Sequence, residues 1–187
     1  MKQHILPALR LTLFCILFFC GVYTFFIWAI ARLAPDKGEG QTLSLNGKVV
    51  GYALDGQNFT QDRYFWSRPS AVSYNGAGSG GSNKGPSNPD YLKDVQSKID
   101  SFQAHNPGIN KEDIPAELVT YSGSGLDPDL SPAGARIQIR RVAAARGLSG
   151  DKLTALVEQS VEKPFLGIFG PPRVNVLKLN IALDQLK

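Results

Sequence analysis

Apolar residues are concentrated in one uninterrupted run near the N-terminus. From Leu11 to Ala31 the chain reads LTLFCILFFCGVYTFFIWAIA, 21 residues without a charge. A helix rises about 1.5 Å per residue, so this run would be about 31 Å long, close to the hydrocarbon thickness of a bilayer. The pattern predicts a transmembrane helix, which we place at residues 11–33 with its ends at Leu11 and Leu33.

A cleaved secretory signal peptide is the alternative interpretation of this run. It too has a basic start and an apolar segment, and Ala29-Ile30-Ala31 resembles a cleavage site. The apolar segment of a signal peptide has only about 7–15 residues, however, and this run is longer. The length therefore favours a retained anchor.

The charges that flank the run predict its orientation. Lys2 and Arg10 precede it, and no acidic residue occurs among the first ten positions. Because Lys and Arg are retained on the cytoplasmic side, we expect residues 1–10 in the cytoplasm and residues 34–187 in the periplasm. The expected location is a bacterial inner membrane, crossed once.

Downstream of the run, the apolar positions follow strand and helix periods. The segment TLSLNGKVVGYAL (Thr42–Leu54) alternates around Asn46-Gly47, which suits a type I′ turn, and predicts a β-hairpin. Apolar residues at helical spacing predict three helices. Each follows a residue that can cap its N-terminus and ends at a proline or glycine: Asn88 to Pro107, Ser131 to Gly147 and Ser149 to Pro164.

The C-terminal apolar segment is ambiguous. Residues 174–186 predict either a strand that turns into a helix or one short helix, and periodicity does not decide between them. With either outcome the sequence predicts an α+β fold: one N-terminal transmembrane helix, then a single small α+β domain of about 150 residues.

The stretch NGAGSGGSNKGPSNP, residues 75–89, has the composition of a flexible linker. A loop of this length within a compact domain is either functional or disordered, and composition alone leaves both interpretations open.

Charge and cysteine content narrow the classes of function. Of the 20 Lys and Arg, Lys2, Arg10 and Arg32 flank the apolar run, so 17 remain against 16 Asp and Glu. The rest of the chain therefore lacks the excess of positive charge that is typical of nucleic-acid-binding proteins. Both cysteines, Cys15 and Cys20, lie inside the run and point in different directions on a helix, so the outer domain has no thiol site and no disulfide.

Motifs for serine catalysis are incomplete. Gly123 and Gly125 stand next to Ser124, whereas a nucleophile elbow needs glycines two residues away. Ser149 and Lys152 match S-x-x-K, but the partner motifs of penicillin-binding enzymes are missing and a helix cap explains the serine. The residues predict no catalytic site.

Phosphate and metal motifs are also incomplete. The glycines and lysine at 80–85 stand in the wrong order for a phosphate-binding loop. Asp127 and Asp129 are too few oxygen donors for a calcium loop, and turn and cap chemistry before Ser131 is the favoured interpretation. We predict no metal site, and cofactor-binding residues stay unknown.

Five stretches in chain order resemble the C subunit of the bacterial Kdp potassium-transporting P-type ATPase. They are YFWSRPSA (Tyr64–Ala71), SGGSNKGPSNP (79–89), LVTYSGSGLDPDLSP (118–132), RVAAARGL (141–148) and GPPRVNVLKLNIALD (170–184). This chain departs from the residues expected of that family at five positions. Asp129 replaces a histidine and Pro171 replaces a glutamate, and the other three are Tyr121, Leu130 and Arg140.

The resemblance implies an accessory, non-catalytic subunit of a high-affinity potassium uptake complex. Its implied partners are a channel-like subunit, a P-type ATPase subunit and a small single-span subunit. The family is described as a catalytic chaperone that raises the ATP affinity of the ATPase subunit in a ternary complex with nucleotide. No tightly bound cofactor is implied, and the sequence contains no phosphate loop that supports direct nucleotide binding.

We expect the two glycine loops to be ordered and to dock against the channel-like subunit, with the nearby aromatic residues packed beneath or between them. The alternative is that the loops only fold the domain. Arg68 is expected to pair with Asp127. The candidate contact residues are Tyr64, Phe65, Trp66, Ser67, Arg68, Gly80, Gly81, Asn83, Ser122, Gly123, Ser124, Gly125 and Asp127.

Two functions from other classes remain alternatives. A membrane-anchored periplasmic hydrolase would act on an ester or on peptidoglycan, and a nucleotide-binding module would bind ATP through the isolated domain.

Overall fold

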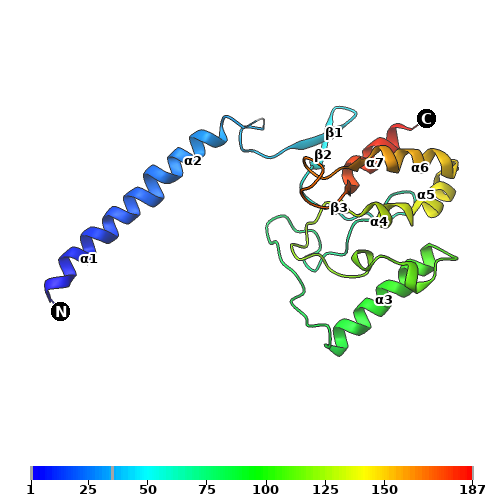
Figure 1. Cartoon of the computed structure of the whole chain (residues 1–187), viewed down its shortest axis with the longest axis horizontal. Helices are drawn as coiled ribbons and strands as arrows, with labels where there is room; N and C mark the ends of the chain where they lie inside the picture. The colour runs from blue at the N-terminus through cyan, green and yellow to red at the C-terminus, as the bar shows by residue number, and fades with distance from the viewer. Residues whose placement is uncertain (1, 35, 187) are drawn as a thin grey trace. The chain divides into compact units, whose positions relative to one another are not determined.

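The computed structural model describes residues 2–34 and 36–186, and the chain divides into two compact units, residues 1–41 and 42–187 (Figure 1). Each unit is described by itself.

The first unit is a single long helix. Helices α1 (Lys2–Cys15) and α2 (Thr24–Ala31) are joined by a π-helical segment, Ile16–Tyr23. The 29 residues Gln3–Ala31 are long and apolar enough to cross a membrane. None of the side chains in its most apolar window is buried, unlike those of a core helix in a soluble protein. The predicted span lies in this helix as far as Ala31, and Leu33 is in the turn that follows.

The second unit opens with the predicted hairpin. Strands β1 (Thr42–Leu45) and β2 (Lys48–Tyr52) pair antiparallel. Asn46 and Gly47 both have positive φ, at 51° and 77°, as a type I′ turn requires. The hairpin prediction is confirmed.

Helix α3 (Pro89–His105) is capped as its sequence predicts. The Asn88 side chain accepts hydrogen bonds from the N–H groups of Asp90 and Tyr91, and Pro89 occupies the first turn. Its Ile99 and Phe102 side chains are buried. Two short 3₁₀ turns, Lys111–Asp113 and Ala116–Leu118, follow without having been predicted.

The helix predicted from Ser131 to Gly147 is two helices, α4 (Pro132–Arg136) and α5 (Ile139–Arg146). The chain tightens between them, where the Gln138 N–H bonds to the Ala135 carbonyl oxygen only three residues back. Helix α6 (Gly150–Gln159) is capped by Ser149, whose hydroxyl accepts from the Lys152 N–H. It ends before the predicted Pro164, because Val161 and Glu162 pair with residues 173–174 as a strand.

The C-terminal segment is a strand that turns into a helix, which settles the ambiguity. Strand β5 (Arg173–Asn175) leads directly into α7 (Val176–Gln185). It is the central strand of an antiparallel sheet, between β3 (Asp129–Leu130) and β4 (Val161–Glu162).

The sheet and the helices enclose one hydrophobic core, in which Phe65, Leu153, Leu179 and Leu183 are fully buried. Figure 1 shows α5, α6 and α7 gathered together and α3 set apart from them. These elements confirm the predicted α+β class.

Candidate functional site

The two glycine loops contact each other. The Gly80 N–H and the Ser79 hydroxyl both donate to the Ser124 carbonyl oxygen, at 2.8 and 3.0 Å. A Cβ atom on Gly81 would lie 3.1 Å from the Gly123 carbonyl oxygen, so the two backbones approach as closely as glycine allows. The stretch that resembles a flexible linker is therefore held against the second loop.

Gly125 and Gly123 have different roles within the second loop. Gly125 has φ +69°, and a Cβ there would lie 2.5 Å from Cγ2 of Val72 and 2.7 Å from the Gly80 carbonyl oxygen. Gly123 has an ordinary φ, open space around it and an exposed surface. Gly125 therefore folds the domain, whereas Gly123 is available for contact with another molecule.

Asp127 follows the second loop and forms the predicted ion pair. The Arg68 guanidinium donates to its Oδ2 at 2.8 Å, and its Oδ1 accepts from the Asp129 N–H at 3.0 Å. The second contact is the turn chemistry expected for this position. Asp127 therefore has partners within the chain for both carboxylate oxygens.

Asp129 stands at the position where the resemblance described above leads us to expect histidine. Its carboxylate lies 3.3 Å from the Arg173 guanidinium, across the β3–β5 pair. Partial burial raises the pKa of Asp129 above its ordinary value, against the lowering effect of Arg173. The substitution is thus accommodated by an ion pair at the sheet edge.

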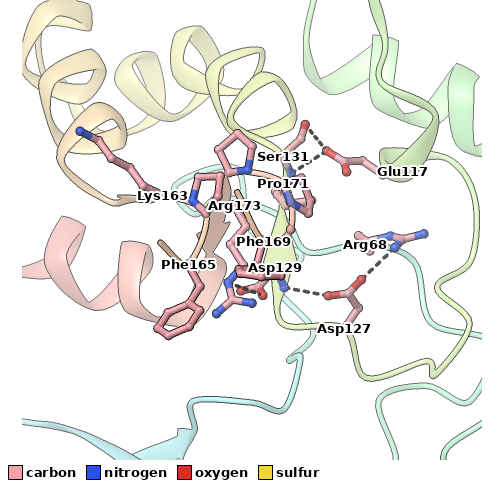
Figure 2. Close-up of a pocket in the computed structure, with 14 residues that line it drawn as sticks. Arg68, Glu117, Asp127, Asp129, Ser131, Lys163, Phe165, Phe169, Pro171 and Arg173 are labelled. Carbon is pink, nitrogen blue, oxygen red and sulfur yellow. Dashed lines mark hydrogen bonds and ion pairs between the residues drawn. The ribbon is translucent and has the colours of Figure 1, made fainter. Parts of the chain in front are cut away.

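A cavity of about 570 Å³ opens beside these residues (Figure 2). In Figure 2, Arg68, Asp127 and Glu117 lie on one side of it and Lys163 and Phe165 on the other. Its lining mixes charged side chains with the aromatic and proline residues of the β4–β5 connection: Arg68, Glu117, Asp127, Asp129, Leu130, Ser131, Lys163, Pro164, Phe165, Phe169, Gly170, Pro171, Pro172 and Arg173.

The serine in this cavity is held in a structural role. The Ser131 hydroxyl donates to Glu117 Oε1 at 2.6 Å and accepts from the Gly134 N–H, which caps α4. His105 lies elsewhere, with Nδ1 2.8 Å from Asp62. Within the described residues, there is no group of three or more His, Cys, Asp or Glu side chains that could hold a metal ion.

The aromatic segment does not pack beneath the glycine loops as expected. Phe65 is 0% exposed, and its N–H and carbonyl oxygen are both bonded to the Asn180 side-chain amide, each at 2.9 Å. The Trp66 N–H donates to Gln138 Oε1 at 2.8 Å. We call residues 64–66, held in this way by Asn180 and Gln138, the clamped segment.

Arg141 completes the clamp, and the sequence did not reveal its role. Its side chain is only 2% exposed, and its guanidinium donates to the carbonyl oxygens of Asp62 and Tyr64 and to Gln138 Oε1. It also lies 4.2 Å from the centre of the Trp66 ring. Burial lowers the pKa of Arg141 to about 10. Arg140 stands beside it and is exposed, so nothing local in the sequence marks Arg141 as the buried arginine.

Burial therefore corrects the list of candidate contact residues. Four of them, Phe65, Ser67, Ser122 and Gly125, are buried and have no surface to offer a partner in this fold. Those with the most open surface are Asn83, Gly123 and Ser124. The remainder are half-buried: Tyr64, Trp66, Arg68, Gly80, Gly81 and Asp127.

An apolar helix long enough to cross a bilayer, followed by a small α+β domain with closely packed glycine loops, fits a single-span membrane protein with one folded domain. The chain matches the family described as KdpC, K⁺-transporting ATPase, c chain, over residues 5–185. The chain belongs to this family.

Individual relatives agree over their full length. The chain is 55% identical to the potassium-transporting ATPase KdpC subunit of Flavobacterium psychrophilum over 99% of this chain and 100% of the relative. It is 52% identical to the KdpC subunit of Flavobacterium johnsoniae over the same shares. The KdpC subunit of Caldanaerobacter subterraneus is 44% identical over 100% of this chain and 98% of the relative.

Proposed function

We propose that this chain is the accessory subunit of a potassium-transporting ATPase complex and has no catalytic activity of its own. The match to the family over residues 5–185 carries this proposal, because it covers the helix and every element of the outer domain. The partners are the channel-like subunit, the ATP-hydrolysing subunit and the small single-span subunit. The N-terminus is cytoplasmic and the folded domain periplasmic, as Lys2 and Arg10 favour.

Its role in the complex is assembly, and through assembly it raises the affinity of the ATP-hydrolysing subunit for ATP. The contacts on this chain are made by Asn83, Gly123 and Ser124, which are exposed on two loops fixed to each other by hydrogen bonds. A surface that is already fixed loses little conformational entropy on binding, which favours a stable subunit contact.

Co-purification tests the assembly role. The chain with a C-terminal tag is isolated from detergent-solubilised membranes that also contain the other subunits, and potassium-dependent ATPase activity is measured. We expect both large subunits to be recovered, and activity to be lost when this chain is omitted. Recovery of this chain alone would contradict the proposal.

Two glycine variants separate docking from folding. Gly123→Val enters open space, so we expect the variant to unfold at the wild-type temperature but to recover less of the channel-like subunit. Gly125→Ala is the control that damages the fold itself, because of its positive φ and the close Gly80 carbonyl oxygen. Full recovery and activity of Gly123→Val would exclude this surface as the contact.

The effect on ATP affinity has its own measurement. The KM for ATP of the purified complex is compared with that of the complex prepared without this chain. We expect the KM to rise when the chain is absent. An unchanged KM with lower maximal activity would leave assembly as the sole role.

A further inference from the structure

The connection between β4 and β5 exposes four large apolar side chains in succession. Phe165, Leu166, Ile168 and Phe169 are 72%, 74%, 76% and 60% exposed. Contiguous apolar surface of this kind on a folded domain marks contact with a membrane or another protein. We call residues 163–172 the apolar loop.

The apolar loop has a defined backbone conformation. The backbone groups of Phe165 and Phe169 exchange two hydrogen bonds, each of 3.0 Å, and the Gly167 N–H bonds to the Pro164 carbonyl oxygen. Leu166 has φ +54°, which a leucine adopts only at a cost. The loop backbone is therefore fixed by its own hydrogen bonds in a conformation that leaves these side chains exposed.

The first β-hairpin adds apolar surface at the same end of the domain. Val49 and Leu54 are 63% and 73% exposed. The Asn175 side chain donates to the Ala53 carbonyl oxygen at 2.7 Å, which ties the end of the hairpin to the strand that leaves the apolar loop. Figure 1 shows the orange loop beside the hairpin.

This end of the domain is also where the chain arrives from the apolar helix. The segment from Arg32 to Gln41 precedes β1, and at no more than about 3.6 Å per residue it reaches about 36 Å at most. The covalent tether therefore keeps the hairpin within reach of the membrane surface, whatever other partners are present.

The charges within the apolar loop and the hairpin themselves suit phospholipid headgroups. The sequence from Lys163 to Pro172 contains one lysine and no acid, and the hairpin from Thr42 to Tyr52 likewise contains only Lys48. Apolar side chains flanked by lysine insert at the level of the acyl-chain boundary, while the ammonium groups contact anionic headgroups.

The geometry points to a lipid contact: the apolar loop inserts into the headgroup region of the bilayer that anchors the chain, with Lys163 at an anionic phospholipid. This adds a second, shallow attachment and restrains the orientation of the outer domain. It goes beyond the proposed function, because it concerns lipid and would hold without any partner subunit.

Depth-dependent quenching tests the inference on the full chain. Cys15 and Cys20 are replaced by Ala, and a polarity-sensitive fluorophore is attached at Leu166→Cys or, as an exposed control on α6, at Ala155→Cys. Each protein is placed in nanodiscs of phosphatidylethanolamine and phosphatidylglycerol, with or without lipids that carry a spin label near the headgroup.

We expect at least a twofold loss of emission at position 166 and almost none at 155. Equal quenching at both positions, or none at 166, would overturn the inference. The measurement is repeated with the purified complex. If emission at 166 stays blue-shifted there but is no longer quenched, a protein subunit covers the loop and the lipid contact is wrong.

Lys163→Glu tests the headgroup contact. We expect it to reduce quenching at position 166 in nanodiscs with phosphatidylglycerol and to leave it unchanged in nanodiscs of phosphatidylcholine alone. An equal reduction in both lipids would contradict the role of the lysine, because electrostatic attraction requires the anionic lipid.

Discussion

The clamped segment and the apolar loop are both short, aromatic and without helix or strand of their own, yet they have opposite surroundings. Phe65 in the first is fully buried, whereas Phe165 in the second is mostly exposed. The difference lies in the backbone. Asn180, Gln138 and Arg141 satisfy the polar groups of residues 64–66 from outside, so the segment can enter the core. The apolar loop satisfies its own groups in a turn, so its side chains remain outside.

This comparison shows that aromatic composition does not distinguish a core segment from an exposed loop. A buried irregular segment requires hydrogen-bond partners from distant parts of the chain, because an unpaired buried N–H or carbonyl group is costly. A buried Asn, Gln or Arg on a helix that faces such a segment is therefore the feature to look for.

Arg141→Ala should break the clamped segment most strongly. It removes the guanidinium that donates to the Asp62 and Tyr64 carbonyl oxygens, and it leaves Gln138 Oε1 with the Trp66 N–H alone. We expect a loss of about 3–5 kcal/mol in the free energy of unfolding. Urea unfolding of the detergent-solubilised chain, followed by Trp66 fluorescence in a Trp28→Phe background, measures it. Arg140→Ala, which alters an exposed neighbour, is the control and should change stability by less than about 0.5 kcal/mol. Equal effects of the two variants would contradict the special position of Arg141.

Asn180→Leu should have the next largest effect. Leucine fits the size of the site but bonds to neither the N–H nor the carbonyl oxygen of Phe65, so we expect a loss of about 2–3 kcal/mol. The same unfolding assay applies, with the exposed Gln185→Leu on α7 as the matched variant. A wild-type midpoint for Asn180→Leu would show that water replaces the amide.

Glu162 lies in β4, just before the apolar loop, and should give a small, pH-dependent effect. The hydrogen bond from Lys178 lowers the pKa of the Glu162 carboxyl. Its contribution is therefore present above the unfolded-state pKa and is lost as the pH falls through the lower, folded-state pKa. Because the pair is partly solvated, we expect Glu162→Gln to cost no more than about 0.5 kcal/mol at pH 7. The two proteins should become equally stable at low pH in thermal melts, and a difference that grows with acidification would contradict this assignment.

Leu166→Ser should have the smallest effect on folding. The side chain is exposed and makes no core contact, so we expect a change within about 0.5 kcal/mol in the same unfolding assay. A large loss of stability would mean that the apolar loop belongs to the core, and would remove its contrast with the clamped segment.

The sequence predicted the features that depend on neighbouring residues. The Asn46-Gly47 turn, the Asn88 cap and the Gly147 helix end with φ +66° all follow from local chemistry. The Arg68–Asp127 pair was also expected and is present, but nothing in the sequence itself establishes a contact between residues 59 positions apart.

Other features could not be predicted, because they depend on contacts between distant parts of the chain. Nothing near Phe65 indicates that Asn180 will bind its backbone, or that Gln138 will interrupt a helix to reach Trp66. The same limit applies to the glycines of the second loop. Gly123 and Gly125 are alike in sequence, and only the positions of Val72 and Gly80 distinguish them.

The clamp also determines when the domain can finish folding. Phe65 and the amide that holds it are 115 positions apart, so the aromatic segment leaves the ribosome long before Asn180 follows. During that interval its apolar side chains and its unpaired backbone are open to aggregation or proteolysis. A chaperone that shields nascent chains would therefore be needed most by this segment, and a pause in synthesis before α7 should leave the domain sensitive to protease at residues 64–66.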